Sequence, residues 1–135
     1  MVHEKEIEIR WRDLDVFGHV NHVVFLTYLE EVRDEWVARV QDDPGAIMRY
    51  VIVRAAIDYR RELTLADDRI VARCSLARIG NSSVMTREEI VTSDGELAAE
   101  AETVLVARDD DTGRSRPLTD AERAAFERAA APVRK

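Results

Sequence analysis

The chain has 135 residues, which is enough for one domain and too short for two of ordinary size. Hydrophobic residues make up 46% and charged residues 35% of it, a balance typical of a folded domain and not of a disordered chain. The net charge of −7 argues against a broad basic surface for DNA or RNA, so we expect no nucleic-acid partner. A small anionic ligand stays compatible with this charge, because a few local arginines suffice to bind it.

The cysteine content and the length of the apolar runs indicate the cellular compartment and exclude some kinds of metal site. Cys74 is the single cysteine, so the chain forms no internal disulfide and no zinc site built on cysteine pairs. The first ten residues lack the apolar core of a signal peptide, and no apolar run approaches the ~18 residues that span a bilayer. We therefore expect a cytoplasmic protein that does not associate with membranes.

The first third of the chain predicts one strand and one long helix. Ile7, Ile9 and Trp11 alternate with charged residues, which indicates a strand with one buried face, and residues 12–22 are predicted as a loop. Apolar residues then recur every three or four positions from 23 to 40, and Leu26 widens this apolar face, which predicts a helix of about five turns. Asn21 suits the N-cap of this helix, and the Asp-Asp-Pro-Gly sequence at 42–45 ends it.

The remainder predicts four strands and a short helix. Period-two patterns cover residues 51–59, 70–79, 84–92 and 97–108, with turns at 67–68, 80–81 and 93–95. Thr119 and Glu122 resemble a capping box that opens a helix to about residue 130. Connections this short exclude parallel neighbours. The class is therefore α+β: a curled antiparallel sheet of about five strands around one long central helix, with a short C-terminal helix, in a single domain over 1–135.

The densest group of polar residues is D-L-D-V-F-G-H-V-N-H at 13–22, followed by F-L at 25–26 and E-E-V-R at 30–33. This pattern resembles the hotdog-fold acyl-CoA thioesterases of the 4-hydroxybenzoyl-CoA thioesterase type, in the branch with the D-x-D-x-x-G-H-V-N-N motif. The segments 78–83, 93–96 and 102–106 are similar to that family too, so the resemblance covers roughly residues 4–118. His22 and Phe25 depart from the pattern, where the family usually has Asn and commonly has Tyr.

The resemblance implies the hotdog fold and the hydrolysis of an acyl-CoA to a free acid and CoA. It implies that Asp15 is the catalytic carboxylate, either as a nucleophile that gives a mixed anhydride or as a general base for water. It also implies that the backbone N–H of His22 binds the thioester carbonyl oxygen, a role that suits an unpaired amide at the positive end of a helix dipole. No metal or cofactor is implied, because a thioester is already a reactive acyl donor and CoA is part of the substrate.

The residues around Asp15 are candidates for supporting roles, and His19 and Asn21 have two interpretations each. His19 either orients Asp15 or water, or only makes hydrogen bonds within the loop. Asn21 is first an N-cap, which also positions the helix amides. Gly18 is expected to permit a turn with positive φ and a close approach of substrate, and Phe25 to line the acyl pocket. Asp13 is expected to be structural.

More distant residues complete the set of candidates. Arg60 and Arg78 are our candidates for the phosphates of CoA, which guanidinium groups bind well. Ser83 resembles a family position near the pantetheine path or the partner's site, and a plain strand serine is an equal reading. Arg33 is expected in a solvated or interface charge set with its helix neighbours, and Cys74 is expected to be a small buried apolar residue.

Three other functions share the expected fold. The first is an acyl-carrier-protein thioesterase, whose acidic partner favours a basic rim that a net charge of −7 does not suggest. The second is a non-catalytic module that binds acyl thioesters, and the third is a hotdog dehydratase, for which we find no second acid–base partner. The open sheet edge predicts a homodimer or homotetramer, and the resemblance implies sites between protomers.

Overall fold

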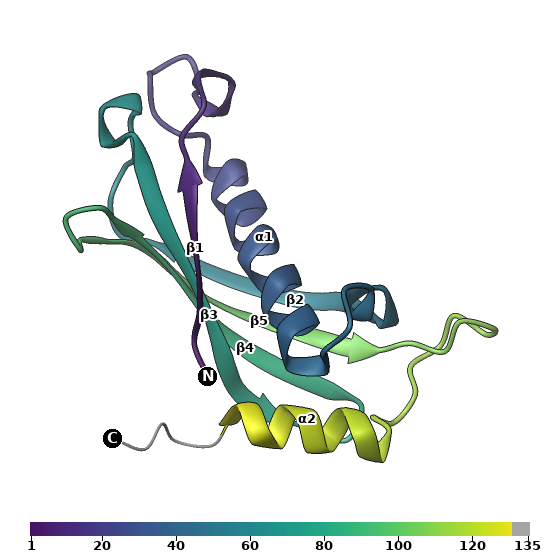
Figure 1. Cartoon of the computed structure of the whole chain (residues 1–135). Helices are drawn as coiled ribbons and strands as arrows, with labels where there is room; N and C mark the ends of the chain where they lie inside the picture. Colours follow the sequence, from purple (N-terminus) through teal and green to yellow (C-terminus); the bar gives the residue numbers. More distant parts are fainter. Residues whose placement is uncertain (131–135) are drawn as a thin grey trace, which may run out of the picture.

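The computed structural model describes residues 1–130 (Figure 1). Five antiparallel strands form one sheet in the order β1-β3-β4-β5-β2. They are β1 (His3–Glu8), β2 (Tyr50–Tyr59), β3 (Arg69–Ile79), β4 (Ser83–Thr92) and β5 (Leu97–Ala107). The two α-helices are α1 (His22–Gln41) and α2 (Asp120–Ala130), and 3-10 turns lie at Trp11–Asp13, Ala46–Arg49 and Leu65–Asp67.

Helix α1 begins and ends where its capping residues place it. The side-chain Oδ1 of Asn21 accepts the N–H of Val23 at 3.0 Å, which confirms the predicted N-cap. The helix ends at Gln41, where Asp42 takes a left-handed conformation with φ 51°. The predicted apolar face is buried in the core: Phe25, Leu29, Val32 and Trp36 are all nearly inaccessible to solvent.

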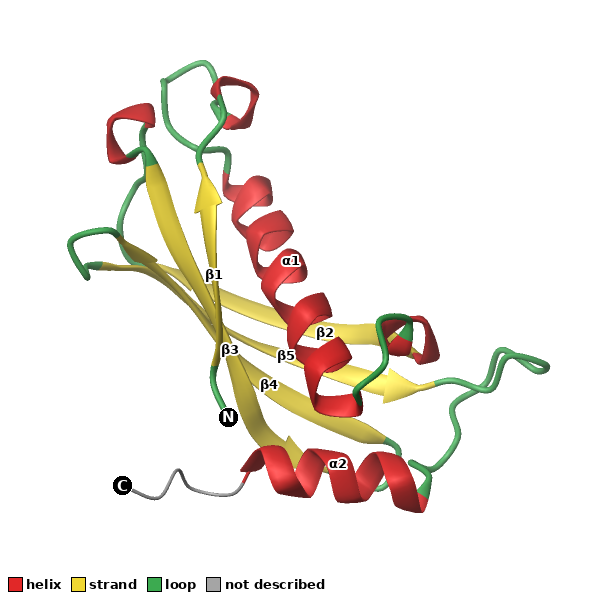
Figure 2. Cartoon of the chain, in the orientation of Figure 1, coloured by secondary structure: helices red, strands yellow, loops and turns green. Residues whose placement is uncertain are grey.

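The sheet curls around α1, which lies across its concave face against β1, β3 and β4 (Figure 2). Alternate residues of β3, β4 and β5 face this helix, and they include Ile70, Val84, Ile90 and Leu105, each with no exposed surface. Burying a side chain of this size contributes about 1.5–3 kcal/mol. The α+β hotdog arrangement predicted above is confirmed. None of the described helices is long and apolar enough to cross a membrane.

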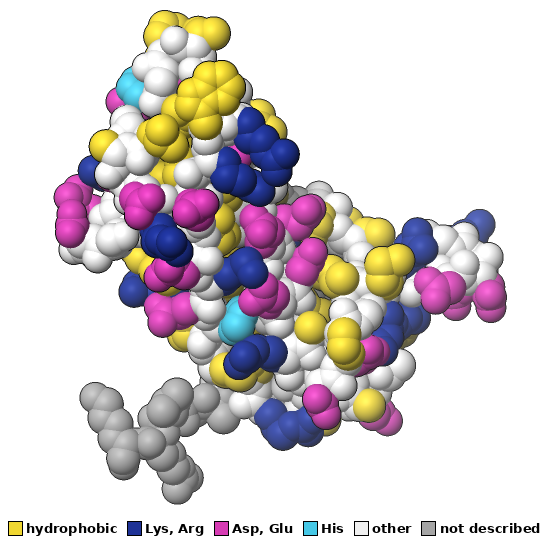
Figure 3. Space-filling view, turned by 45° about the horizontal axis from the view of Figure 1, so that its top comes forward, with side chains coloured by type: hydrophobic (Ala, Val, Ile, Leu, Met, Phe, Trp, Pro, Cys, Tyr) yellow, Lys and Arg dark blue, Asp and Glu magenta, His cyan; other side chains and the backbone are white. Residues whose placement is uncertain are grey.

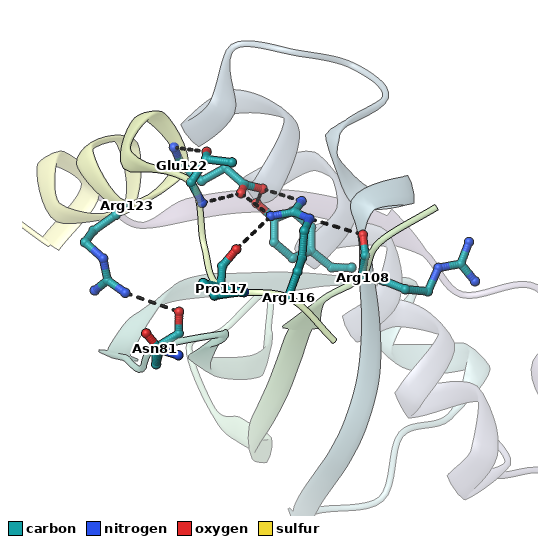
Figure 4. Close-up of polar contacts among 8 residues, drawn as sticks. Asn81, Arg108, Arg116, Pro117, Glu122 and Arg123 are labelled. Carbon is teal, nitrogen blue, oxygen red and sulfur yellow. Dashed lines mark hydrogen bonds and ion pairs between the residues drawn. The ribbon is translucent and has the colours of Figure 1, made fainter. Parts of the chain in front are cut away.

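Helix α2 closes the lower end of the molecule (Figure 1), and Figure 4 shows the polar contacts around its first turn. The predicted capping box is present, since Thr119 N–H donates to the Glu122 carboxylate at 2.9 Å and Glu122 N–H donates to the Thr119 hydroxyl at 3.1 Å. The same carboxylate accepts hydrogen bonds from the Tyr50 hydroxyl at 2.5 Å and from Arg116 at 2.6 Å. Burial alone would raise the pKa of Glu122, but these donors outweigh it and lower the pKa to about 2.

Two local expectations are wrong. Strand β1 ends at Glu8, and Trp11 lies in a 3-10 turn with 79% of its surface exposed. The cause is a local hydrogen bond, because the carboxylate of Asp13 accepts the N–H of Arg10 at 3.0 Å and turns the chain before the strand can continue. Leu26 was expected on the buried face of α1 and is 38% exposed beside β2.

Arg33 is buried, where a solvated or interface charge set was expected. Its Nη1 donates to Glu88 Oε2 at 2.8 Å and to Thr103 Oγ1 at 3.3 Å, and the Thr103 hydroxyl donates to Glu88 Oε1 at 2.6 Å. Glu88 has no exposed surface, and this burial raises its pKa although Arg33 acts in the opposite direction. A charged group therefore ties the middle of α1 to β4 and β5 inside the core.

Candidate functional site

Two loops that are distant in sequence meet at the upper end of the sheet (Figure 1). Val20 N–H donates to the carbonyl of Leu63 at 2.7 Å, and His19 forms an isolated antiparallel bridge with Thr64. This pairing joins the loop before α1 to the connection between β2 and β3. Between them lies an open cavity of about 390 Å³, which is lined by Asp15, His19, Val20, His22, Phe25, Tyr59, Arg60, Arg61 and Glu62.

The carboxylate of Asp15 accepts hydrogen bonds through one of its two oxygens. Its Oδ1 accepts the N–H groups of Phe17 at 2.9 Å and His19 at 3.2 Å. Gly18 sits at the tip of this turn with φ 80°, the conformation expected for it. In the part of the chain that the structure describes, Oδ2 of Asp15 has no hydrogen-bond donor. The loop therefore orients the carboxylate and leaves one oxygen for a reactant.

The start of α1 leaves one amide available. The cap of Asn21 takes the N–H of Val23, and Val24 N–H donates to the carbonyl of Asn21 at 2.8 Å. The N–H of His22, the first helical residue, has no acceptor among residues 1–130. It combines an unpaired donor with the positive end of a helix dipole, as an oxyanion site requires.

Tyr59 is the last residue of β2, and it holds the first turn of α1 by a hydrogen bond. Its hydroxyl donates to the carbonyl of His22 at 2.8 Å, and its ring packs edge-on against Phe25 with centroids 5.1 Å apart. Burial raises the pKa of Tyr59, which keeps the hydroxyl protonated as a donor. Sequence reasoning missed this residue, because its partner in α1 is 37 positions away.

The rim of the cavity is charged. His19 Nε2 lies 3.2 Å from Glu62 Oε2, with 36% and 72% of the two side chains exposed. Arg60 binds Glu100 at 2.6 Å, and Arg61 binds Asp67 at 3.1 Å. The sequence showed neither Arg61 nor Glu62 as site residues; the available signal was their position directly after a predicted strand.

The other predicted residues lie outside this cavity. Asn21 and Gly18 adjoin it through the loop and the cap just described. Arg78 and Ser83 lie at the opposite end of β3 and β4; nine residues of extended chain separate Arg78 from Arg69, which is about 30 Å. Within one chain they do not reach Asp15. No three His, Cys, Asp or Glu side chains of residues 1–130 are grouped as metal ligands.

Comparison with known proteins gives one family and several similar structures. Residues 9–127 match the thioesterase-like superfamily. The long-chain acyl-CoA thioesterase FadM of Escherichia coli (strain K12) is 28% identical over 111 residues, which cover 78% of this chain and 83% of that protein. A Thermus thermophilus thioesterase complexed with coenzyme A and Zn is 31% identical, with a TM-score of 0.87 and coverage of 97% and 96%. A predicted thioesterase from Bacillus stearothermophilus is 27% identical, with a TM-score of 0.86 and 96% of each chain covered.

Proposed function

The chain belongs to the thioesterase-like superfamily and is a thioester hydrolase, and on that premise we propose that it converts an acyl-CoA and water to a free carboxylic acid and CoA, with Asp15 as the catalytic carboxylate. The observation that carries this proposal is the juxtaposition in one cavity of the oriented carboxylate of Asp15 and the unpaired N–H of His22. Within the superfamily, the motif at 13–22 favours the 4-hydroxybenzoyl-CoA thioesterase type.

The proposed reaction uses these two groups together. The thioester oxygen binds the N–H of His22, which stabilises the negative charge that develops when the carbonyl carbon is attacked. Asp15 either attacks this carbon, expelling the CoA thiolate and leaving a mixed anhydride that water cleaves, or takes a proton from the water that attacks. Both routes end with one water consumed, the acid released and a proton delivered to the thiol.

A CoA substrate suits the surface better than an acyl carrier protein. The similar proteins include an acyl-CoA thioesterase and a thioesterase bound to coenzyme A. On the face drawn in Figure 3, Lys and Arg side chains are interspersed with Asp and Glu, so it presents no continuous basic area for an acidic protein. The phosphates of one CoA need only a few cations, and Arg60 and Arg78 remain our candidates for them.

The working unit in this proposal is a homodimer joined along β2. This strand forms an edge of the sheet, and Val51, Ile52 and Val53 are each more than a third exposed on it. A groove of about 320 Å³ beside it is lined by Val23, Leu26, Thr27, Glu30, Arg33, Ile52 and Ala55. We propose that a second copy covers this edge, which would bury the apolar surface, and that it contributes its own Arg78 and Ser83 to the first cavity.

Thiol release over a panel of acyl-CoA esters tests the hydrolysis. We expect Asp15→Asn to lower kcat by at least about a hundredfold. Asp94→Asn is the matched control, because it removes an exposed loop carboxylate next to a glycine at the same end of the sheet. A wild-type protein that releases no thiol from any ester refutes the function, and full activity of Asp15→Asn refutes the role of Asp15 alone. Thiol release from acyl-carrier-protein substrates only would establish the alternative function, that of an acyl-carrier-protein thioesterase.

Complementation tests the shared site. Asp15→Asn and Arg78→Glu are each expected to be impaired as homodimers, while a mixed dimer holds one site with both native residues. We expect co-expressed and co-purified mixed dimers to recover about half of the wild-type activity per dimer. No recovery in a verified mixed dimer would show that Arg78 does not contribute to the site of the partner chain.

A further inference from the structure

A buried tyrosine–carboxylate pair lies at the base of the loop that carries Asp15. Tyr28 has no exposed surface, and its hydroxyl donates to Asp13 Oδ2 at 2.7 Å. Asp13 is 4% exposed, and the same oxygen accepts the N–H of Arg10 at 3.0 Å. Burial would raise the pKa of Asp13, but the Arg10 N–H, the Tyr28 hydroxyl and the Arg10 charge outweigh it and lower the pKa. The group is therefore a held, ionised carboxylate inside the protein.

The backbone of Asp13 continues this link toward the cavity. Its carbonyl accepts the N–H of Asn21 at 2.9 Å, and Asn21 is the N-cap of α1. One residue further, Leu14 bridges Val20 across the loop, and the next residue is Asp15. Asp13 thus contacts three segments at once: the residues after β1 through Arg10, the core face of α1 through Tyr28, and the start of α1 through Asn21.

We propose that Tyr28 and Asp13 are positioning residues for the hydrolysis, which set the distance between the carboxylate of Asp15 and the N–H of His22. The inference rests on the proposed function. Neither residue lines the cavity, so both act through the backbone. Tyr28 lies almost two helical turns after His22 and packs in the core, which makes it a rigid reference point. Its hydrogen bond to Asp13 fixes the position of the loop that carries Asp15 relative to α1.

The expected effect is on the chemical step. A misplacement of about 1 Å between reacting groups costs roughly a hundredfold in rate, whereas substrate binding through the cavity walls changes little. Tyr28→Phe keeps the ring in the core and removes only the donor. The carboxylate of Asp13 then lacks one partner and its loop gains freedom. We expect kcat to fall by about tenfold or more with KM within about twofold of wild type.

Tyr50→Phe is the matched control. Tyr50 is also buried, and its hydroxyl also donates to a carboxylate, that of Glu122 at 2.5 Å, but at the opposite end of the molecule. The two variants lose the same kind of bond, so a general loss of stability affects both. We expect both to lower the denaturant midpoint and only Tyr28→Phe to lower kcat.

Amide hydrogen exchange gives a readout that does not depend on activity. In Tyr28→Phe, the amides of residues 13–22 are expected to exchange faster than in wild type, and in Tyr50→Phe they are expected to be unchanged. Asp13→Asn, which retains an acceptor oxygen for Arg10, is expected to give a smaller change of the same kind. Equal kcat in Tyr28→Phe and Tyr50→Phe, or unchanged exchange at 13–22, overturns the inference. A wild type that hydrolyses no thioester overturns the proposed function instead, while the exchange result still decides whether this pair orders the loop.

Discussion

The carboxylate of Glu122 is expected to make a large contribution to the loss of stability of the protein in acid. The perturbation is Glu122→Gln, which keeps the size of the side chain and removes its charge. Glu122 caps α2, binds Arg116 and accepts the hydroxyl of Tyr50, and its pKa is lowered to about 2 (Figure 4). The carboxylate therefore favours the folded state only while it is ionised.

The magnitude follows from the pKa. The ordinary pKa of a glutamate is 4.5. Each unit by which the folded state lowers this pKa adds about 1.4 kcal/mol to the free energy of unfolding, so a folded-state pKa of about 2 corresponds to roughly 3 kcal/mol. Because the folded pKa is depressed, this contribution is complete above about pH 5 and is lost as the pH falls toward 2. By about pH 3, roughly 2 kcal/mol of it is gone.

Urea unfolding of the wild type and of Glu122→Gln between about pH 7 and pH 3 measures this loss. Other carboxylates titrate equally in both proteins, so the difference in the free energy of unfolding isolates Glu122. We expect the difference to shrink by roughly 2 kcal/mol over this range. Glu127→Gln is the control, since Glu127 is an exposed residue of the same helix. A difference between wild type and Glu122→Gln that stays constant with pH would contradict the assignment of this contribution to Glu122.

Three further outcomes are expected. Arg33→Met leaves Glu88 buried without its cation and should cost about 3–5 kcal/mol in urea unfolding, while the double variant with Glu88→Leu should recover most of that loss. Asn21→Ala removes the cap and should cost about 1 kcal/mol and lower kcat in the thiol-release assay; unchanged kcat would separate the cap from the oxyanion amide. Burial raises the pKa of the Cys74 thiol, so a thiol reagent should modify Cys74 in urea and not in the native protein, as followed by mass spectrometry.

Much of the fold could be predicted because its signals are local. Helix α1 follows from a period of three to four residues and the Asn21 cap, and the predicted bounds differ from the observed ones by one residue at each end. The sheet follows from short turns that allow only antiparallel pairs. Trp11 was mispredicted because its alternation with charged residues competes with a hydrogen bond from Arg10 to Asp13, and period alone does not weigh the two.

Long-range pairs explain what the sequence did not show. Arg33 lies four residues after Leu29, on the buried face of α1, but its charge indicated solvent because Glu88 lies 55 positions away. Tyr59 reaches His22 in the same way, by strand pairing that places the end of β2 beside the helix terminus. In both cases the residue type was visible and its partner was not.

Local contacts position the groups proposed for the reaction, whereas long-range contacts supply the rest of the cavity that receives the substrate. The groups proposed for the chemistry, Asp15 and the N–H of His22, lie within one segment of eight residues, so a single motif can set their geometry. The remaining cavity wall comes from Tyr59 to Glu62, and a second copy is proposed to supply Arg78. Substitutions at 60–62 can therefore alter substrate binding while leaving the carboxylate and amide in place. We expect proteins that share the motif at 13–22 to share the reaction, and to differ in substrate where the connection between β2 and β3 differs.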